Sequence, residues 1–391
     1  MPFEGGIPPE VVDDILEYLG PDRQTLLSCC RASKGFSARV VPLLYQDLEI
    51  LYLSETRAVG RKYFTEYHLS RSSAVLLDAL YVNPSLGKYC AKLTIKVRRK
   101  ELEDMVRLRT APTVEALTEL FERLPYVEEF VAPSSHDRQG RYNALNSAIG
   151  GAMPALGGPT KSLRQLKMAR LDDSSFLPLL QFPNLVHLEV GEAKTKYPPP
   201  ADPLPPFHLQ TLIFDTADEA LFAYGTSNSH DSLVHLSTPY SFPLSSLGQP
   251  FRNLRSLTIT FSQYASHDPT KRLRTLDALK LYLSRNVTLR TLTFSHPDET
   301  PRSGRCTLLE SLPPNLNALL LDPFELSWFP AARHYVPNWP RSLKKVRWTA
   351  CLYGEDWADT GKEEVEEVCR RRGIETVEFL SAADLTGGTQ A

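Results

Sequence analysis

The chain has 391 residues, of which 42% are hydrophobic, and its charge is nearly balanced, with 44 Lys and Arg against 46 Asp and Glu. A balanced charge creates no general attraction to nucleic acid or to anionic lipid, and no stretch approaches the roughly 20 apolar residues that a membrane-spanning helix requires. The chain is also longer than an ordinary compact domain, so we expect two segments or one elongated architecture.

Cysteine usage predicts a reducing compartment. The six cysteines lack C-x-x-C spacing, and the polar, Pro-rich start of the chain carries no secretory leader pattern. We therefore expect a cytoplasmic and/or nuclear protein without a nucleic-acid or membrane partner. The cysteines are Cys29, Cys30, Cys90, Cys306, Cys351 and Cys369.

The first fifty residues are predicted to form short amphipathic helices. After Pro8 and Pro9, apolar residues recur at helical spacing until Gly20-Pro21 ends the run. Two further apolar runs follow over residues 23–33 and 36–50. A unit of this size buries too little apolar surface to be stable when isolated, and it has more apolar side chains than its own interior can hold. Some of these side chains should face a partner or the neighbouring domain.

The order of residues in this segment resembles an F-box, in the form common in fungal F-box proteins. The pattern is Ile7-Pro8-x-Glu10, Ile15-Leu16-x-x-Leu19, Leu26-Leu27-x-x-Cys30-x-x-Ser33-x-x-Phe36 and Pro42-x-Leu44-Tyr45. Ile7 stands where Leu is usual, and Phe36 where Trp is common; both keep an apolar group. The resemblance implies docking onto a Skp-type adaptor that links the chain to a cullin-RING ubiquitin ligase. The positions implied to contact the adaptor, or to support the contact, are Ile7, Pro8, Glu10, Ile15, Leu16, Leu19, Leu27, Cys30, Ser33 and Phe36. The alternative is a helical bundle that only caps the following domain.

Beyond residue 80 the chain repeats. Nine segments match L-x-x-L-x-Φ, where Φ is usually apolar, and six of the eight separations between successive copies fall within the roughly 20 to 29 residues typical of leucine-rich repeats. The chain resembles that family, and weaker copies near residues 90 and 127 indicate an early start. The first apolar residues of the nine copies are Leu163, Leu185, Leu209, Leu233, Leu254, Leu289, Leu316, Leu343 and Ile374.

The spacers predict the return segments of these repeats. Amphipathic helical patterns begin at residues 113, 174, 273 and 363, so each repeat is a strand followed by a return segment that is often helical. Strand alternation sends Leu188 and Val190 inward and His187, Glu189 and Gly191 to the concave face. Only Cys351 fits the Asn or Cys position that follows the strand in regular repeats, so no continuous Asn ladder is expected and the curvature should be irregular.

These patterns predict an α/β fold, with a small all-α helical unit followed by an irregular solenoid of parallel strands on the concave face and helices or loops on the convex face. The expected segments are an F-box domain over 1–50, a helical linker over 51–89, the repeats over 90–380 and a flexible tail over 381–391. Residues 132–162 are expected to form a long inserted loop. Residues 196–207 contain P-x-x-P and predict a stiff loop rather than a polyproline ligand.

No constellation predicts catalysis or a cofactor. The common phosphate, dinucleotide, zinc and serine-hydrolase motifs are missing, and no His stands in an interpretable relation to Cys351. His187 and His235 occupy equivalent positions two strands apart, with Asp215 on the strand between them. At about 4.8 Å per strand, the imidazoles lie roughly 10 Å apart, which is too far to share one metal ion.

Function is therefore expected to lie in recognition. Under the F-box resemblance, the chain is the substrate-recognition subunit of an SCF-type ubiquitin ligase, without catalytic residues of its own. The alternative is a repeat scaffold that joins partners without a ligase. Candidate contacts to the unknown protein substrate are the strand-face residues Lys167, His187, Glu189, Asp215, His235, Thr258, Thr291, Lys345 and Arg347.

Overall fold

The computed structural model divides the chain into two compact units, Met1–Leu185 and Val186–Ala391, which we describe separately. The structure describes residues 9–19, 22–32, 34–59, 62–99, 112–133, 143–157, 162–172, 179, 181–194, 204–215, 219–239, 251–261, 269–295, 308–322, 338–350 and 362–380. The expected tail over 381–391, the Pro-rich residues 196–203, Cys351 and most of the helix expected from residue 174 lie outside these ranges.

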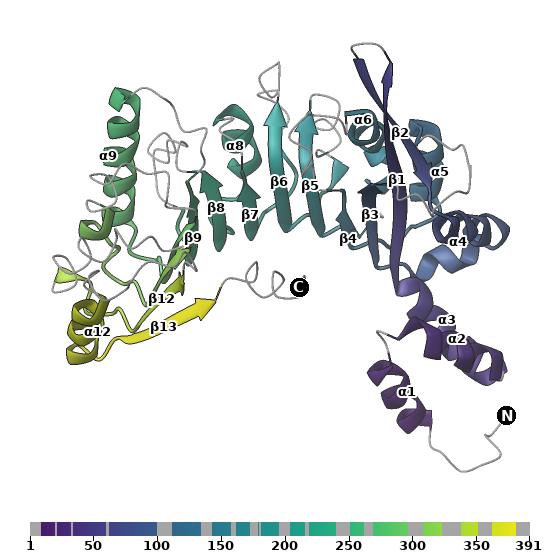
Figure 1. Cartoon of the computed structure of the whole chain (residues 1–391), viewed down its shortest axis with the longest axis horizontal. Coiled ribbons are helices and arrows are strands. Elements are labelled where there is room, and N and C mark those ends of the chain that lie inside the picture. Colours follow the sequence, from purple (N-terminus) through teal and green to yellow (C-terminus); the bar gives the residue numbers. More distant parts are fainter. Residues whose placement is uncertain are drawn as a thin grey trace. The chain divides into compact units, whose positions relative to one another are not determined.

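The first unit begins with three helices, α1 (Pro9–Tyr18), α2 (Arg23–Ala32) and α3 (Lys34–Gln46) (Figure 1). Their shared core consists of Val12, Leu16, Leu26 and Val40, each at most 3% exposed. Partly buried side chains pack around this core, and they are Leu19, Cys29, Cys30, Phe36, Leu43 and Leu44. The predicted helical unit is thus present and has a small core of its own.

The third helix leads directly into a sheet. Strand β1 (Asp47–Val59) pairs antiparallel with β2 (Lys62–Leu69) and parallel with β3 (Lys92–Arg99). Strands β4 (Glu129–Val131) and β5 (Gln165–Asp172) continue this sheet in the order β5-β4-β3-β1-β2. The expectation of a helical linker over 51–89 is wrong in its first part, because residues 51–59 belong to β1 and Lys62–Leu69 form β2. Leu48, Ile50 and Tyr52 of β1 alternate into the core with the period of a strand.

The remaining helices of the first unit connect its strands. They are α4 (Arg71–Val82), the short 3-10 helix η1 (Pro84–Tyr89), α5 (Val114–Glu122), α6 (Asn143–Ala152) and the 3-10 helix η2 (Met153–Leu156). Helix α5 confirms the amphipathic pattern at residue 113. The inserted loop expected over 132–162 is wrong, since α6 and η2 lie within it. Leu145 and Ile149, one helical turn apart, are fully buried and give α6 a core-facing side despite its Gly and Ala content.

Among its described residues, the second unit has eight parallel strands that follow one another in chain order. They are β6 (His187–Lys194), β7 (Thr211–Phe214), β8 (His235–Pro239), β9 (Ser256–Thr260), β10 (Thr291–Ser295), β11 (Ala318–Asp322), β12 (Lys345–Ala350) and β13 (Glu375–Leu380). Helices α8 (Glu219–Thr226), α9 (Pro269–Arg285) and α12 (Lys362–Arg371) lie between strands along the chain. Figure 1 shows α9 and α12 to one side of the strands. The fold is a leucine-rich-repeat solenoid, as predicted.

The repeated leucines form rows through the second unit. The register aligns Leu188, Leu212, Leu236, Leu257 and Leu292 on five consecutive strands, and each is at most 4% exposed. This row confirms the predicted strand alternation and supplies a continuous core.

The last copy departs from the pattern. The register pairs Lys345 with Glu375, so Thr376 rather than Val377 aligns with the buried Val346. Gly373, with φ of 69°, joins α12 to β13 in a conformation that favours glycine.

Polar side chains just before the strands join successive repeats. The hydroxyls of Ser232, Thr288 and Ser342 donate to the carbonyl oxygen of the first leucine of the preceding repeat, at 2.8, 2.9 and 2.8 Å. Asn253 and Asn315, at the same repeat position, donate to carbonyls two residues further upstream, at 2.6 and 2.8 Å. The regular ladder therefore lies before the strand and not at the Asn or Cys position that follows it.

Removing one hydroxyl of this ladder should destabilise the second unit. We expect Ser232→Ala to lower the free energy of unfolding by about 1 kcal/mol, because the carbonyl of Leu209 loses a part-buried donor. The matched control is Ser284→Ala, whose exposed hydroxyl bonds only within its own helix, and its effect should stay within about 0.5 kcal/mol. Urea unfolding followed by circular dichroism measures both. Equal effects of the two substitutions would contradict a role for the ladder.

Candidate protein-interaction surfaces

Helix α1 has apolar side chains on two sides. Val12 and Leu16 face the core of the helical unit, at 3% and 2% exposed. Val11, Ile15 and Tyr18 recur at i, i+4 and i+7 on another side, at 43%, 48% and 87% exposed. A helix that is apolar on more than one side is usually covered on both. We call Val11, Ile15 and Tyr18, together with Leu27 of α2, which is 46% exposed, the exposed apolar group.

Polar contacts fix the helix that carries Leu27. The Asp22 carboxylate caps α2 by accepting from the backbone N–H groups of Gln24 and Thr25, at 3.1 and 3.2 Å. It also accepts from the Thr25 hydroxyl at 2.6 Å, and this hydrogen bond is the main cause that lowers the pKa of Asp22. Arg23 then donates to the carbonyl oxygens of Leu44 and Asp47, at 3.2 and 2.5 Å. The start of α2 is thereby tied to the junction of α3 and β1.

The residues that the F-box resemblance implies differ in how far they are buried. Ile15 and Leu27 are exposed and free to contact a partner, whereas Leu16 belongs to the core of the helical unit. Leu19, Cys30 and Phe36 are partly buried against that core, and burial raises the pKa of the Cys30 thiol. Ile7, Pro8 and Ser33 lie outside the described residues, as does the side chain of Glu10. Val11 and Tyr18 were missed, although their spacing from Ile15 was visible in the sequence.

The second candidate surface is the open face of the second unit's sheet, meaning the strand residues that alternate with the buried rows. The register aligns His187, Thr211 and His235 on β6, β7 and β8. Hydroxyl side chains fill the middle of this face on β9 and β10, where Ser256 aligns with Thr291 and Thr258 with Thr293. The result is a band of small, uncharged hydrogen-bonding groups. It contains two of the predicted contacts, Thr258 and Thr291.

Charged residues flank this band. His187 and Glu189 lie within 3.9 Å of each other on β6, and exposed Asp215 directly follows β7. Lys345 and Arg347 lie on β12, where Lys345 is paired with Glu375 at 2.9 Å. Seven of the predicted substrate contacts in the second unit therefore lie on the open face of the sheet, and Asp215 lies just after the end of β7. The seven are His187, Glu189, His235, Thr258, Thr291, Lys345 and Arg347.

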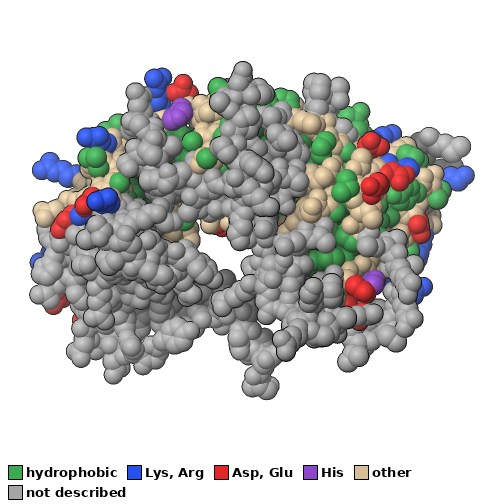
Figure 2. Space-filling view, turned by 90° about the horizontal axis from the view of Figure 1, so that it is seen from above, with side chains coloured by type: hydrophobic (Ala, Val, Ile, Leu, Met, Phe, Trp, Pro, Cys, Tyr) green, Lys and Arg blue, Asp and Glu red, His purple; other side chains and the backbone are tan. Residues whose placement is uncertain are grey.

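The corresponding face of the first unit is more strongly charged. Glu129 lies between two lysines on neighbouring strands, 3.3 Å from Lys92 and 3.8 Å from Lys167. Lys96 pairs with Glu49 at 2.6 Å. The predicted contact Lys167 therefore already has an acidic neighbour. On the face that Figure 2 shows, Lys and Arg side chains lie beside Asp and Glu side chains.

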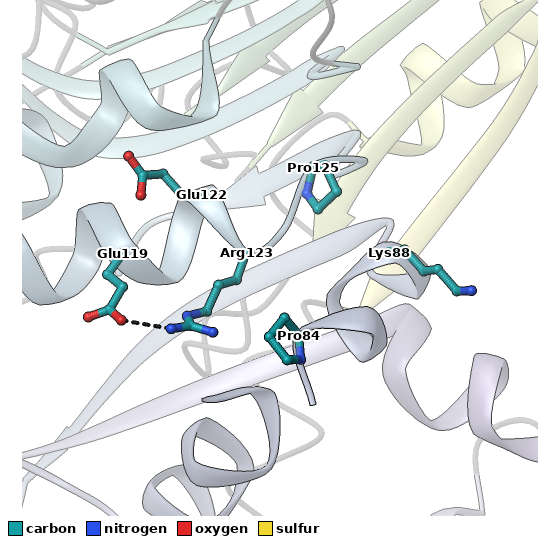
Figure 3. Close-up of a pocket in the computed structure, with 6 residues that line it drawn as sticks. All are labelled: Pro84, Lys88, Glu119, Glu122, Arg123 and Pro125. Atoms are coloured by element: carbon teal, nitrogen blue, oxygen red, sulfur yellow. Dashed lines mark hydrogen bonds and ion pairs between the residues drawn. The ribbon is translucent and has the colours of Figure 1, made fainter. Parts of the chain in front are cut away.

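A shallow pocket of about 430 Å³ lies between η1 and α5 in the first unit, lined by Pro84, Lys88, Glu119, Glu122, Arg123 and Pro125. Figure 3 shows Arg123 bonded to Glu119, and the distance is 2.8 Å. The Arg123 guanidinium also covers the Tyr81 ring at 4.4 Å from its centroid. Desolvation raises the pKa of Tyr81, with a further contribution from Glu119. Glu119 accepts from Nη2 of Arg123, whereas the buried Nε of Arg123 has no hydrogen-bond partner among the described residues. Both Arg123 and Glu119 contact Tyr81, so the pair joins α4 to the end of α5.

The described residues include no cluster of three or more His, Cys, Asp or Glu side chains that could hold a metal ion. Within the same residues, no helix has the length and apolar character needed to cross a membrane. The register separates His187 and His235 by one intervening strand, as the sequence predicts.

Comparisons with known proteins add little beyond this description. No family model matches the chain, and no curated protein matches it. Among solved structures, the Rad7 and Elc1 complex in yeast has a TM-score of 0.36 and 14% identity, covering 75% of this chain and 76% of that one. A protein from Bacteroides fragilis has a TM-score of 0.34 and 11% identity, covering 84% of this chain and 92% of that one. The assignment of a repeat scaffold rests on the strand register and the leucine rows.

Proposed function

We propose that this protein is the substrate-recognition subunit of an SCF-type ubiquitin ligase. Helices α1 and α2 bind a Skp-type adaptor and through it a cullin-RING ligase, while the repeats bind a protein substrate. The chain itself performs no chemistry. It accelerates ubiquitin transfer by raising the local concentration of substrate lysines near the conjugating enzyme.

The exposed apolar group carries this proposal. Ile15 and Leu27 occupy positions of the F-box-like pattern and are about half exposed in the isolated chain, and Val11 and Tyr18 extend the same surface of α1. Tyr is one of the side chains that most often supply a large share of the binding energy at protein interfaces, and burial of the apolar neighbours of Tyr18 adds a hydrophobic contribution. A helical unit with its own small core and a second apolar side is suited to docking onto another protein.

Affinity purification of the full chain tests the proposal. With an inhibitor of the proteasome present, the tagged chain should bring down a Skp-type adaptor and a cullin from an extract of its own organism. A known F-box protein purified in parallel gives the positive control. If that control recovers the adaptor and the chain does not, the proposed function is wrong.

A second candidate function is a repeat scaffold whose helical unit is a structural cap. The hydrogen bonds from Arg23 to Leu44 and Asp47, and the direct passage from α3 into β1, favour it because they join the helices to the sheet. Under this function, charged substitutions in the exposed apolar group would lower the stability of the sheet. Under the ligase function, they remove adaptor binding and leave the sheet intact.

A further inference from the structure

Basic side chains form a row at the edge of the second unit where the strands begin. Each lies one residue after the first leucine of its repeat: Arg255 before β9, Arg290 before β10 and Lys344 before β12. Backbone hydrogen bonds join these positions directly. The N–H of Arg290 donates to the carbonyl of Arg255 at 2.8 Å, that of Asn317 to Arg290 at 2.8 Å, and that of Lys344 to Asn317 at 2.9 Å. Residues far apart in sequence are therefore immediate neighbours in this row.

Two more arginines lie three residues upstream of row members, at equivalent repeat positions. Arg252 precedes Arg255, and Arg341 precedes Lys344. We call these five residues the basic edge: Arg252, Arg255, Arg290, Arg341 and Lys344. All five are exposed, and the Arg252 side chain is 74% exposed. Asn253 lies between Arg252 and Leu254, and Ser342 lies between Arg341 and Leu343. Their side chains donate hydrogen bonds to the preceding repeat and so belong to the ladder described above.

The charge of this edge is only partly compensated. Asp231 lies 3.5 Å from Arg252, and Glu375, further along, is paired with Lys345. Within the part of the chain that the structure describes, no carboxylate pairs with Arg255, Arg290, Arg341 or Lys344. The whole chain carries a formal net charge of −2, so this concentration of positive charge is a local feature. Positive charges gathered at one place repel one another and attract anionic partners.

We infer that the basic edge binds an acidic segment of a partner protein, which is the substrate if the proposed function holds. Arg255 and Lys344 are separated by three strand spacings, about 14 Å, which an extended peptide spans with about four or five residues. Val287, at the repeat position equivalent to Arg252, is 58% exposed among these cations. An acidic segment that includes an apolar residue complements this arrangement. Nucleic-acid surfaces combine cations with exposed aromatic rings for stacking, and the described residues of this edge include none.

The test uses the full chain and fluorescein-labelled hexaglutamate, with binding followed by fluorescence anisotropy. We expect saturable binding that weakens as salt rises. The variant Arg255→Glu, Arg290→Glu, Lys344→Glu should bind at least about tenfold more weakly. The matched control is Arg71→Glu, Lys88→Glu, Arg274→Glu, which changes the net charge equally at exposed helix positions elsewhere. This control should bind within about twofold of the wild type.

The inference is overturned if the edge variant binds hexaglutamate as tightly as the wild type, or if the control loses as much affinity. It is also overturned if an oligouridylate of equal charge binds more tightly than hexaglutamate, which would indicate a nucleic-acid surface. Copurification of the adaptor with the edge variant separates this inference from the proposed function. If the edge variant loses hexaglutamate binding but still copurifies with the adaptor, the result supports an acidic partner at the basic edge. If the wild-type chain binds hexaglutamate but no adaptor, only the ligase function is disproved.

Discussion

Replacing Ile15 and Leu27 together by Asp should abolish binding of a Skp-type adaptor without unfolding the helical unit. Both side chains are about half exposed in the isolated chain, so a carboxylate there stays hydrated in the free protein and is buried only in the complex. Interface anchors of this type each contribute about 2 kcal/mol or more, which corresponds to roughly 30-fold in affinity per residue. Titration calorimetry with purified adaptor measures the loss, and far-ultraviolet circular dichroism measures the fold.

Two further variants make this prediction specific. Leu16→Asp places a charge in the core beside Val12 and Leu26, so it should lose adaptor binding and helical signal together, with a destabilisation of about 3 kcal/mol or more. Ala38→Asp with Gln46→Asp adds the same charge at exposed positions of α3 and should bind normally. If the Ile15 and Leu27 variant behaves like the Leu16 variant, the exposed apolar group has a structural role and the helical cap is favoured.

Gly87→Ala should destabilise the first unit strongly. Gly87 is buried in η1, and a Cβ atom there would lie 1.9 Å from the backbone carbonyl oxygen of Arg123 at the end of α5. A backbone atom cannot rotate away as a side chain can, so η1 and α5 must separate. Overpacking of a buried site costs typically about 1 to 3 kcal/mol, and we expect the upper end of that range. The change in the free energy of unfolding is measured by urea denaturation.

Gly225→Ala provides the matched control. Gly225 lies near the end of α8 in the second unit, and a Cβ atom there would meet nothing within 4 Å. The same chemical change should therefore be neutral or should stabilise the chain by up to about 1 kcal/mol, because Ala has the higher helix propensity. Destabilisation by Gly225→Ala as large as that by Gly87→Ala would show that the effect does not come from the Arg123 carbonyl.

The repeats could be predicted from the sequence because each copy has the same local pattern. The leucines of L-x-x-L-x-Φ occupy aligned core positions from β6 onward. A single copy is enough to predict which side chains of its strand point into the core and which point outward. The start of the sheet was harder to predict. Pro42 lies inside α3, and no Gly or Pro marks the passage from α3 into β1 between residues 43 and 50. The change of period from helix to strand at Leu48 therefore has no local signal in the sequence.

The functional surfaces could be predicted only in part. The F-box-like pattern marked the correct helices, but a pattern does not say that Leu16 points into the core while Ile15 points away from it. The repeat pattern already places Arg255, Arg290 and Lys344 at one equivalent position, directly after the first leucine of their copies. The pattern does not say that these copies stack as neighbouring strands or that the three side chains are exposed, and the structure supplies both facts.

Titration calorimetry of the purified wild-type chain with a purified Skp-type adaptor shows whether the helical unit binds an adaptor. We expect one adaptor bound per chain with micromolar or tighter affinity, and a large negative heat-capacity change from burial of the exposed apolar group. If a wild-type chain that is folded by circular dichroism shows no detectable binding, the helical unit is not an adaptor-binding unit.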